Sequence, residues 1–182
     1  MGVKPFAKGK LHAAASVAGW ARFREDARMN QTPSQRLAAL GLSLPPAPKP
    51  VAAYVPFAKV GNLVFVSGQL PMRDGAMVAK GAVPGQVSIE TAADAARQAA
   101  LNGLAVLADA AGGLDRVRRI VRVGVFVCSE AGFTDQPKVA NGASELLQQV
   151  FGDEGRHARA AVGNIALPLG ACVEVELLAE VA

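Results

Sequence analysis

The block from His157 to Glu176, HARAAVGNIALPLGACVEVE, constrains the fold of this chain more than any other segment. Two largely apolar runs flank Leu167-Pro168-Leu169-Gly170, which predicts two strands joined by a turn. Side chains alternate between the two faces of a strand. The set expected to face the core is apolar: Ala171, Val173, Val175 and Leu177. The set expected on the opposite face is mixed: Cys172, Glu174, Glu176 and Leu178.

Arg159 and Glu174 are expected to lie roughly opposite each other across this strand pair. An arginine presents a planar fork that can hold a carboxylate at two points. One interpretation is a cross-strand salt bridge on a solvated face, the commoner use of such a pair. The other is a cleft in which Arg159 binds an anion and Glu174 holds a water. The spacing alone leaves both open.

The composition indicates one domain with a core built from Ala, Val and Leu. Of the 182 residues, 51% are hydrophobic but only 5% are aromatic. No apolar run reaches the 18 or so residues that a spanning helix needs, so no membrane association is expected. Cys128 and Cys172 fall in predicted strands without metal-ligand spacing, which favours reduced thiols in or near the core and a cytoplasmic protein.

The net charge of +4 belongs to the N-terminal segment. Residues 1–30 contain six basic residues and two acidic ones, and residues 31–182 contain 13 of each. A neutral folded part lacks the positive surface that polyanions attract, so nucleic-acid binding is not expected.

We expect three parts along the chain. Residues 1–29 are predicted to be a disordered or frayed basic segment, with Met29 as an alternative start. Residues 30–50 are predicted to form a short helix, capped by Thr32 and running from Gln35 to Leu40, and a proline-rich extended strap. Residues 51–182 form the main domain.

The main domain is predicted to be an α+β layer. Its expected elements are an extended segment at 51–60, a strand at 63–67, a hairpin at 72–80 that turns at Asp74-Gly75, a helix at 89–111, a strand at 117–127, a helix from Asp135 to about 150 and the final strand pair. This order predicts one mixed sheet with two helices packed on one face. The other face also carries apolar residues, and self-association is the simplest way to cover it.

Several familiar chemistries lack their residues. His157 is the one histidine in the predicted domain, and Ser67 lies in Val-Ser-Gly without a nucleophile-elbow motif. Phosphate-loop, dinucleotide-binding and metal-cluster motifs are absent from the sequence, so no cofactor or metal is expected. The cluster Arg116, Arg118, Arg119 and Arg122 could bind phosphate, but a solvated strand face is the commoner use of such a cluster.

Two separated blocks carry a family resemblance. The first is Tyr54 followed by Gly61-Asn62-Leu63-Val64-Phe65-Val66-Ser67-Gly68-Gln69-Leu70-Pro71. The second follows Phe133 and Asn141 and runs from Arg159 through Leu167-Pro168 to Val173-Glu174-Val175-Glu176. Together they resemble the RidA/YjgF family of reactive imine and enamine deaminases, from about residue 50 to the end. The segment before residue 50 departs from the family pattern and marks a divergent branch.

The resemblance implies a chorismate mutase-like fold, a homotrimer with sites in clefts between subunits, and hydrolysis of 2-aminoacrylate-type enamines and imines to 2-keto acids and ammonia. Arg159 matches the family arginine that holds the substrate carboxylate, and Glu174 matches the acid that helps to place water. Positions that line the family's cleft correspond to Tyr54, Ser67, Gly68, Asn141 and Ala161, where Ala161 replaces a frequent cysteine.

Two alternative functions stay open at this point. An endoribonuclease, an activity also attached to relatives of this family, would need a general acid and base and a positive groove. The neutral domain and its solitary His157 do not favour it. A non-catalytic module that binds small carboxylates would use the same arginine without turnover.

Overall fold

The computed structural model describes residues 31–47 and 54–182. The predictions for residues 1–29, the alternative start at Met29 and the end of the proline-rich strap lie outside these residues. The helices are α2 (Pro33–Ala39), α3 (Ile89–Ala111) and α4 (Gln136–Phe151), with 3-10 turns η1 (Leu114–Arg116), η2 (Gly152–Gly155) and η3 (Pro168–Gly170). The strands are β1 (Phe57–Val60), β2 (Leu63–Gln69), β3 (Met72–Arg73), β4 (Ala76–Met77), β5 (Val117–Cys128), β6 (Ala158–Asn164) and β7 (Val173–Val181).

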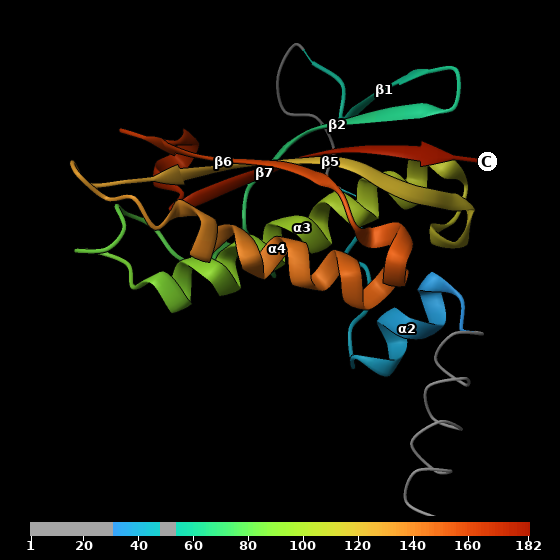
Figure 1. The fold of residues 1–182 in the computed structure, drawn as a ribbon, viewed down its shortest axis with the longest axis horizontal. Helices are drawn as coiled ribbons and strands as arrows, with labels where there is room; N and C mark the ends of the chain where they lie inside the picture. The colour runs from blue at the N-terminus through green and yellow to red at the C-terminus, as the bar shows by residue number, and fades with distance from the viewer. Residues whose placement is uncertain (1–30, 48–53) are drawn as a thin grey trace, which may run out of the picture. The chain divides into compact units, whose positions relative to one another are not determined.

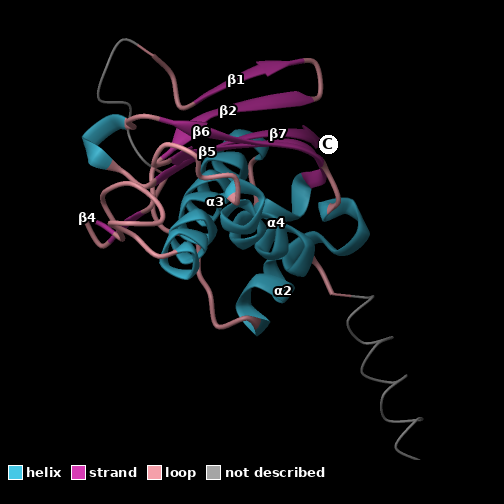
Figure 2. Cartoon of the chain, turned by 60° about the vertical axis from the view of Figure 1, so that its left-hand side comes forward, coloured by secondary structure: helices cyan, strands magenta, loops and turns pink. Residues whose placement is uncertain are grey.

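The main sheet has five strands in the order β1-β2-β7-β5-β6. Strands β1, β2, β7 and β5 are antiparallel neighbours, whereas β5 and β6 are parallel. The predicted α+β fold with a mixed sheet is therefore confirmed, and α3 and α4 cover one face of it (Figure 1). Figure 2 shows the same two layers from another side, with the sheet above the helices.

The predicted hairpin at the C-terminal end is wrong. Strands β6 and β7 do not pair with each other, because β5 lies between them and pairs with both. Helix α4 carries the chain back to the starting end of β5, so β6 can only run parallel to β5. The segment containing η3 then crosses the end of β5 to reach β7. The predicted turn is thus a crossover connection within the sheet.

Local chemistry explains the ends of the long helix α3. The Ser88 side chain accepts a hydrogen bond from the Thr91 backbone N–H at 3.2 Å, which caps the first turn. The helix ends at Gly112, whose φ of 75° is the left-handed conformation that glycine adopts without strain. Small residues let the two helices approach closely: a Cβ at Gly142 of α4 would clash with the Ala93 carbonyl oxygen of α3.

Helix α2 adds a short layer to the far side of α4. Thr32 and Gln35 form a reciprocal capping box, in which each side chain accepts from the other residue's backbone N–H. Leu37 is 4% exposed and belongs to the main core. The Ser34 backbone N–H donates to Asp115 Oδ1 at 2.8 Å, which fixes the start of α2 to the connection before β5.

Burial along β7 follows the predicted alternation. Val173, Val175, Leu177, Ala179 and Val181 face the helices and are buried, whereas the residues between them are partly exposed. In β5, the row that faces the helices contains Val123, Val125 and Val127. A bulge between Ile120 and Arg122 places Ile120 in the core and leaves Val121 partly exposed.

The face of the sheet away from the helices exposes apolar side chains. Phe65 of β2 is 46% exposed and Val162 of β6 is 45% exposed. In the ranges that the structure describes, no helix combines the length and apolarity that crossing a bilayer requires.

Candidate functional site

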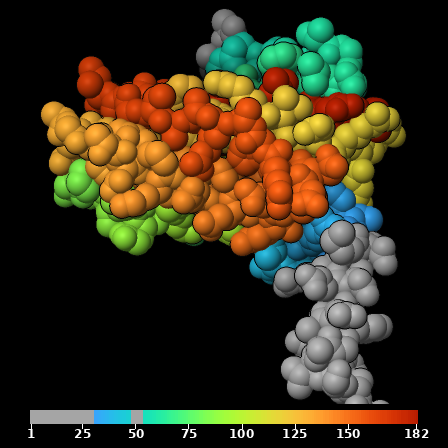
Figure 3. All heavy atoms as spheres, viewed as in Figure 1, coloured from blue at the N-terminus to red at the C-terminus, as the bar shows by residue number. Residues whose placement is uncertain are grey.

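Arg159 lies on β6, the strand at one edge of the sheet, and its side chain is directed to the helix-covered side. Its backbone aligns with Val123 of β5, which is fully buried among the core residues. The guanidinium Nη1 donates to Asn141 Oδ1 at 2.9 Å and to Ser144 Oγ at 3.1 Å. Both acceptors belong to α4 and lie one helical turn apart, so they share a helix face. Residues of α4 and β6 form one continuous surface, orange to red-orange in Figure 3.

The remaining donors of Arg159 form a free edge. Nη1 carries two hydrogens, and its two acceptors on α4 use both. Among the described residues, none accepts a hydrogen bond from Nε or Nη2, and the side chain is exposed overall. Nε and Nη2 form one side of the guanidinium fork, the geometry that binds a carboxylate through two parallel hydrogen bonds. The arginine is therefore held on one side and open on the other.

Sequence reasoning missed the parts that Ser144 and His157 play here. Ser144 is 7% exposed and bonds both to Arg159 and to His157 Nε2, the latter at 3.0 Å. His157 Nδ1 contacts the Gly155 carbonyl oxygen at 2.6 Å. Burial lowers the pKa of His157, and the positive charge of Arg159 acts in the same direction, against the opposing effect of the Gly155 carbonyl. The signal in the sequence was the helical spacing of Ser144 from Asn141.

Glu174 belongs to a different group of residues, on the opposite face of the sheet. It aligns with Phe126 of β5, and Gly68 of β2 lies directly against it. A Cβ at Gly68 would clash with Glu174 Oε1, so only glycine leaves the carboxylate where it is. Burial raises the pKa of Glu174, and the neighbouring charge of Glu176 raises it further.

Ser67 and Tyr54 lie towards the same end of β2 as Gly68. The Ser67 hydroxyl donates to the Val55 carbonyl oxygen at 2.7 Å, which ties the segment before β1 to the end of β2. Tyr54, the residue before Val55, is 51% exposed. Ala161 of β6 is aligned with the buried Val125 and packs against the core, on the same face of the strand as Arg159.

Arg159 and Glu174 are consequently not opposite each other, and the expectation of a facing pair is wrong. Arg159 aligns through Val123 with Leu177, whereas Glu174 aligns through Phe126 with Val162. The insertion of β5 between the two strands produces this separation. A salt bridge between the two residues is also excluded, because no ion pair joins them among the described residues.

Two of the three arginines of β5 pair with carboxylates of β7. Arg122 Nη1 lies 2.7 Å from Glu176 Oε1, and Arg118 Nη1 lies 3.7 Å from Glu180 Oε1. These contacts favour the interpretation of the arginine cluster as a solvated strand face. Glu176 and Glu180 are thus paired, whereas Glu174 has no ion pair in the described part of the chain.

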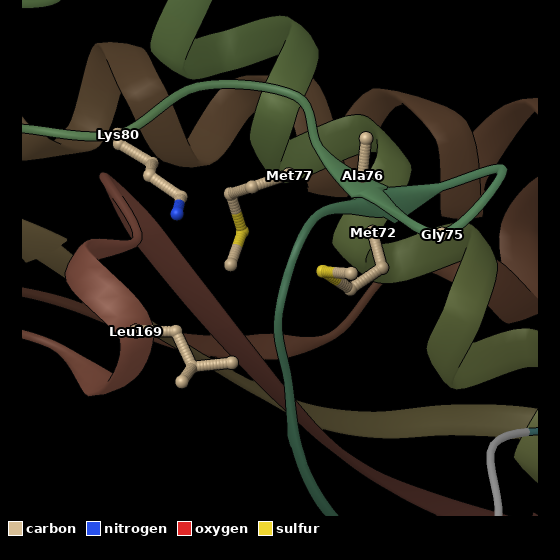
Figure 4. A pocket seen from close by; sticks show the side chains of 6 residues that line it. All are labelled: Met72, Gly75, Ala76, Met77, Lys80 and Leu169. Atoms are coloured by element: carbon tan, nitrogen blue, oxygen red, sulfur yellow. The ribbon is translucent and has the colours of Figure 1, made fainter.

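A separate pocket of about 460 Å³ lies beside the β3–β4 hairpin and η3. Figure 4 shows the Lys80 amine directed into the space between Met77 and Leu169. The pocket is lined by Met72, Gly75, Ala76, Met77, Lys80 and Leu169. None of the seven residues expected to form the site lines it, so it is distinct from both groups described above.

Comparison with known proteins agrees with the fold and with the two motif blocks. The sequence model described as "YjgF/chorismate_mutase-like, putative endoribonuclease" matches residues 34–181. The chain belongs to the RidA/YjgF family. The match begins within α2, so the family region starts earlier in the chain than the position near residue 50 that the motifs indicated.

Relatives in this family carry different descriptions. "Protein TCP17" of Trypanosoma cruzi is 45% identical over 84% of this chain and 98% of its own length. The "2-iminobutanoate/2-iminopropanoate deaminase" of Dermatophagoides farinae is 34% identical over 74% of this chain and 91% of its own. The crystal structure of Atu1372 from Agrobacterium tumefaciens, a protein described there as having unknown function, superposes with a TM-score of 0.77 at 40% identity, covering 89% of this chain and 99% of that one.

Proposed function

We propose that this protein hydrolyses reactive enamines and imines of the 2-aminoacrylate and 2-iminopropionate type to 2-keto acids and ammonia. The observation that carries the proposal is the held guanidinium of Arg159, whose Nε/Nη2 side is open at the edge of the sheet. Substrates of this class are small carboxylates. Two-point binding by a pre-oriented arginine fixes both the position and the rotation of such a carboxylate.

Glu174 is the proposed proton relay. Burial raises the pKa of this carboxyl, and a carboxyl with a raised pKa is a stronger base than an ordinary surface glutamate. A water oxygen adds to C2 of the imine as its proton passes through Glu174 to the nitrogen. The carbinolamine then collapses: its hydroxyl proton takes the same route, the C–N bond breaks, and ammonia leaves. Two protons thus move from the water to the nitrogen, and Glu174 is regenerated without any cofactor.

The two residues are proposed to meet across a subunit boundary. Within one protomer, Arg159 and Glu174 project from opposite faces of the sheet, so one protomer alone does not bring them together. We propose a homotrimer in which β6 of one protomer lies beside the Glu174 and Gly68 surface of its neighbour. Such packing would also cover the exposed side chains of Phe65 and Val162. Tyr54, Ser67, Asn141 and Ala161 are then proposed to line the shared cleft.

A cytoplasmic location is part of the same proposal. Cys128 and Cys172 are buried free thiols, which suits a reducing compartment. Burial raises the pKa of Cys172 to about 11, so it remains a protonated thiol rather than a reactive thiolate. Neither cysteine takes part in the proposed reaction.

The test is ammonia release from imino acids generated in situ by an amino-acid oxidase. The wild-type protein should accelerate hydrolysis, and Arg159→Ala should reduce kcat/KM by at least about 100-fold through loss of two-point binding. Arg159→Lys, which keeps the charge but not the fork, should restore only a small part of the rate. The oligomeric state of each variant, measured by light scattering, should match the wild type.

The outcomes separate the rival functions. A full deaminase rate in Arg159→Ala would refute the proposal. Binding of 2-ketobutyrate by the wild type without any ammonia release would favour a non-catalytic carboxylate-binding module. RNA cleavage that depends on His157 would favour a nuclease, although both ring nitrogens of His157 are already engaged by Ser144 and Gly155.

A further inference from the structure

Arg159 and three neighbouring groups form one ordered chain of hydrogen bonds. The chain runs from the Gly155 carbonyl through the two ring nitrogens of His157 to the Ser144 hydroxyl and then to Arg159 Nη1, with distances of 2.6, 3.0 and 3.1 Å. It links η2, α4 and β6. The mechanism above uses Arg159 at the end of this chain but gives no role to His157.

The two ends of the chain determine which atom donates in each hydrogen bond. A carbonyl oxygen only accepts, so Nδ1 of His157 must carry the hydrogen that points to Gly155. In the neutral ring, Nε2 then has a lone pair and accepts the Ser144 hydroxyl hydrogen. The Ser144 oxygen is left with lone pairs only, and it accepts from Arg159 Nη1. Each donor therefore has one acceptor, and the arrangement has no alternative while His157 is neutral.

We propose that His157 is a positioning residue: acting through Ser144, it turns the Arg159 guanidinium so that its Nε/Nη2 side faces the substrate carboxylate. This inference rests on the proposed function, since it concerns the same arginine. His157 touches neither the substrate nor the reacting atoms. Its effect is on carboxylate affinity and not on the rate of the chemical step.

Protonation of His157 would reverse the hydrogen bond between its Nε2 and the Ser144 hydroxyl. Nε2 would become a donor, so the Ser144 oxygen would face donors from both His157 and Arg159 and its own hydrogen would need another acceptor. A second positive charge would also appear next to Arg159. The charged residues on the surrounding elements belong to β6, α4, η2 and β5: Arg159, Lys138, Glu145, Asp153, Glu154, Arg118, Arg119 and Arg122. Lys138 pairs with Asp135 at 2.8 Å. Asp153 pairs with Arg156 at 3.4 Å, and Glu145 and Glu154 are exposed.

The burial of the chain favours the neutral state. Ser144 is 7% exposed and His157 is half-buried, so a charge at His157 is poorly solvated. The lowered pKa of His157 agrees with this direction. Arg159 is therefore held in its binding orientation at neutral pH, and the hold should weaken as the pH falls through the pKa of His157.

The experiment measures the dissociation constant of 2-ketobutyrate, a stable carboxylate of the product class, by calorimetry on the whole protein. His157→Phe keeps a ring of similar size but loses both hydrogen bonds, and it should weaken binding about tenfold. His157→Gln keeps an acceptor near the position of Nε2 and should stay within about threefold of the wild type. Under saturating imine, kcat of either variant should remain within about twofold of the wild type.

A double-mutant cycle with Ser144→Ala separates a linked chain from independent structural damage. If His157 acts through Ser144, adding His157→Phe to Ser144→Ala should weaken binding no further. The dissociation constant of the wild type should also rise on acidification, and that of His157→Phe should lose this dependence. Nitrogen-15 NMR of the wild type should show His157 neutral at pH 7 with its proton on Nδ1.

The outcomes distinguish this inference from the proposed function. Additive effects of the two substitutions, or unchanged binding in a folded His157→Phe, would overturn the positioning role and leave the deaminase proposal intact. A wild-type protein that neither binds 2-ketobutyrate nor releases ammonia would overturn both. If His157→Phe does not fold, the Ser144→Ala result, the wild-type pH dependence and the NMR tautomer decide the question.

Discussion

The two faces of the central sheet carry polar groups that are held in different ways. On the helix-covered side, Arg159 is fixed by Asn141 and Ser144, which are themselves part of the rigid helix α4. On the opposite face, Glu174 is bounded by Gly68 and by a like charge on Glu176. The first group is fixed by hydrogen bonds, whereas the second is perturbed by burial and repulsion.

This difference suits two separate tasks. A side chain that must orient a substrate benefits from donors and acceptors that are fully paired on one side, because little rotational freedom is then lost on binding. A side chain that must exchange protons benefits from a shifted pKa, which hydrogen bonds to its charged form would oppose. Under the proposed function, binding belongs to one face and proton transfer to the other, so substitutions on each face should have different kinetic signatures.

Glu174→Gln should give the largest effect on turnover. The amide cannot accept a proton from water, so kcat should fall by about 10²- to 10⁴-fold while binding of 2-ketobutyrate changes little. In the wild type, activity should fall as the pH drops through the raised pKa of Glu174, because the ionised form is the base. This fall in activity, the acidic limb of the pH–activity profile, should occur at a higher pH than the pKa of an ordinary glutamate would give. It should be absent in Glu174→Gln.

Glu176→Gln is the matched control for this prediction. It removes the neighbouring charge that raises the pKa of Glu174, so the acidic limb should move to lower pH while the maximal rate is kept. It also breaks the 2.7 Å pair with Arg122, a partly exposed contact that contributes no more than about 1 kcal/mol to stability. An unchanged limb in both variants would mean that another group controls the pH dependence.

Gly68→Ala should have a smaller effect on turnover. The added Cβ would clash with Glu174 Oε1, the end of a movable side chain, so the carboxylate should shift while the fold stays intact. A displaced proton relay should lower kcat about tenfold with little change in the melting temperature. Gly124→Ala is the control, since its Cβ would lie 2.6 Å from Glu176 Oε1 instead. Equal losses in the two variants would contradict a special role for Glu174.

The sequence predicted the locally encoded parts of this fold well. Helix α3 was expected at residues 89–111 and is found there, because the Ser88 cap and the glycine at position 112 mark its ends chemically. The alternation along β7 was also correct, since one face of that strand is apolar throughout. These features depend on neighbouring residues, which any single sequence contains.

The pairing of β6 and β7 with β5 could not be predicted from the sequence. Nothing between His157 and Glu176 distinguishes a hairpin from two strands that both pair with β5, because the choice depends on where α4 returns the chain. The error carried over to the site, where Arg159 and Glu174 were expected to face each other. The link between Ser144 and His157 was missed for a similar reason: it joins α4 to the residue before β6, and only the folded chain brings the two together.

Asn141→Ala should have the smallest effect of the substitutions considered, and the effect should be on carboxylate affinity. It removes one of the two acceptors of Arg159 Nη1 and leaves Ser144 to hold the guanidinium. The loss of one exposed hydrogen bond to a charged group should raise the dissociation constant of 2-ketobutyrate about three- to tenfold and leave kcat nearly unchanged. Asn62→Ala is the control, because Asn62 bonds Glu180 at 2.9 Å on the other face. A lower kcat with unchanged binding in Asn141→Ala would mean that Asn141 acts in the chemical step. It would contradict the proposal that one face of the sheet binds the substrate and the other transfers protons.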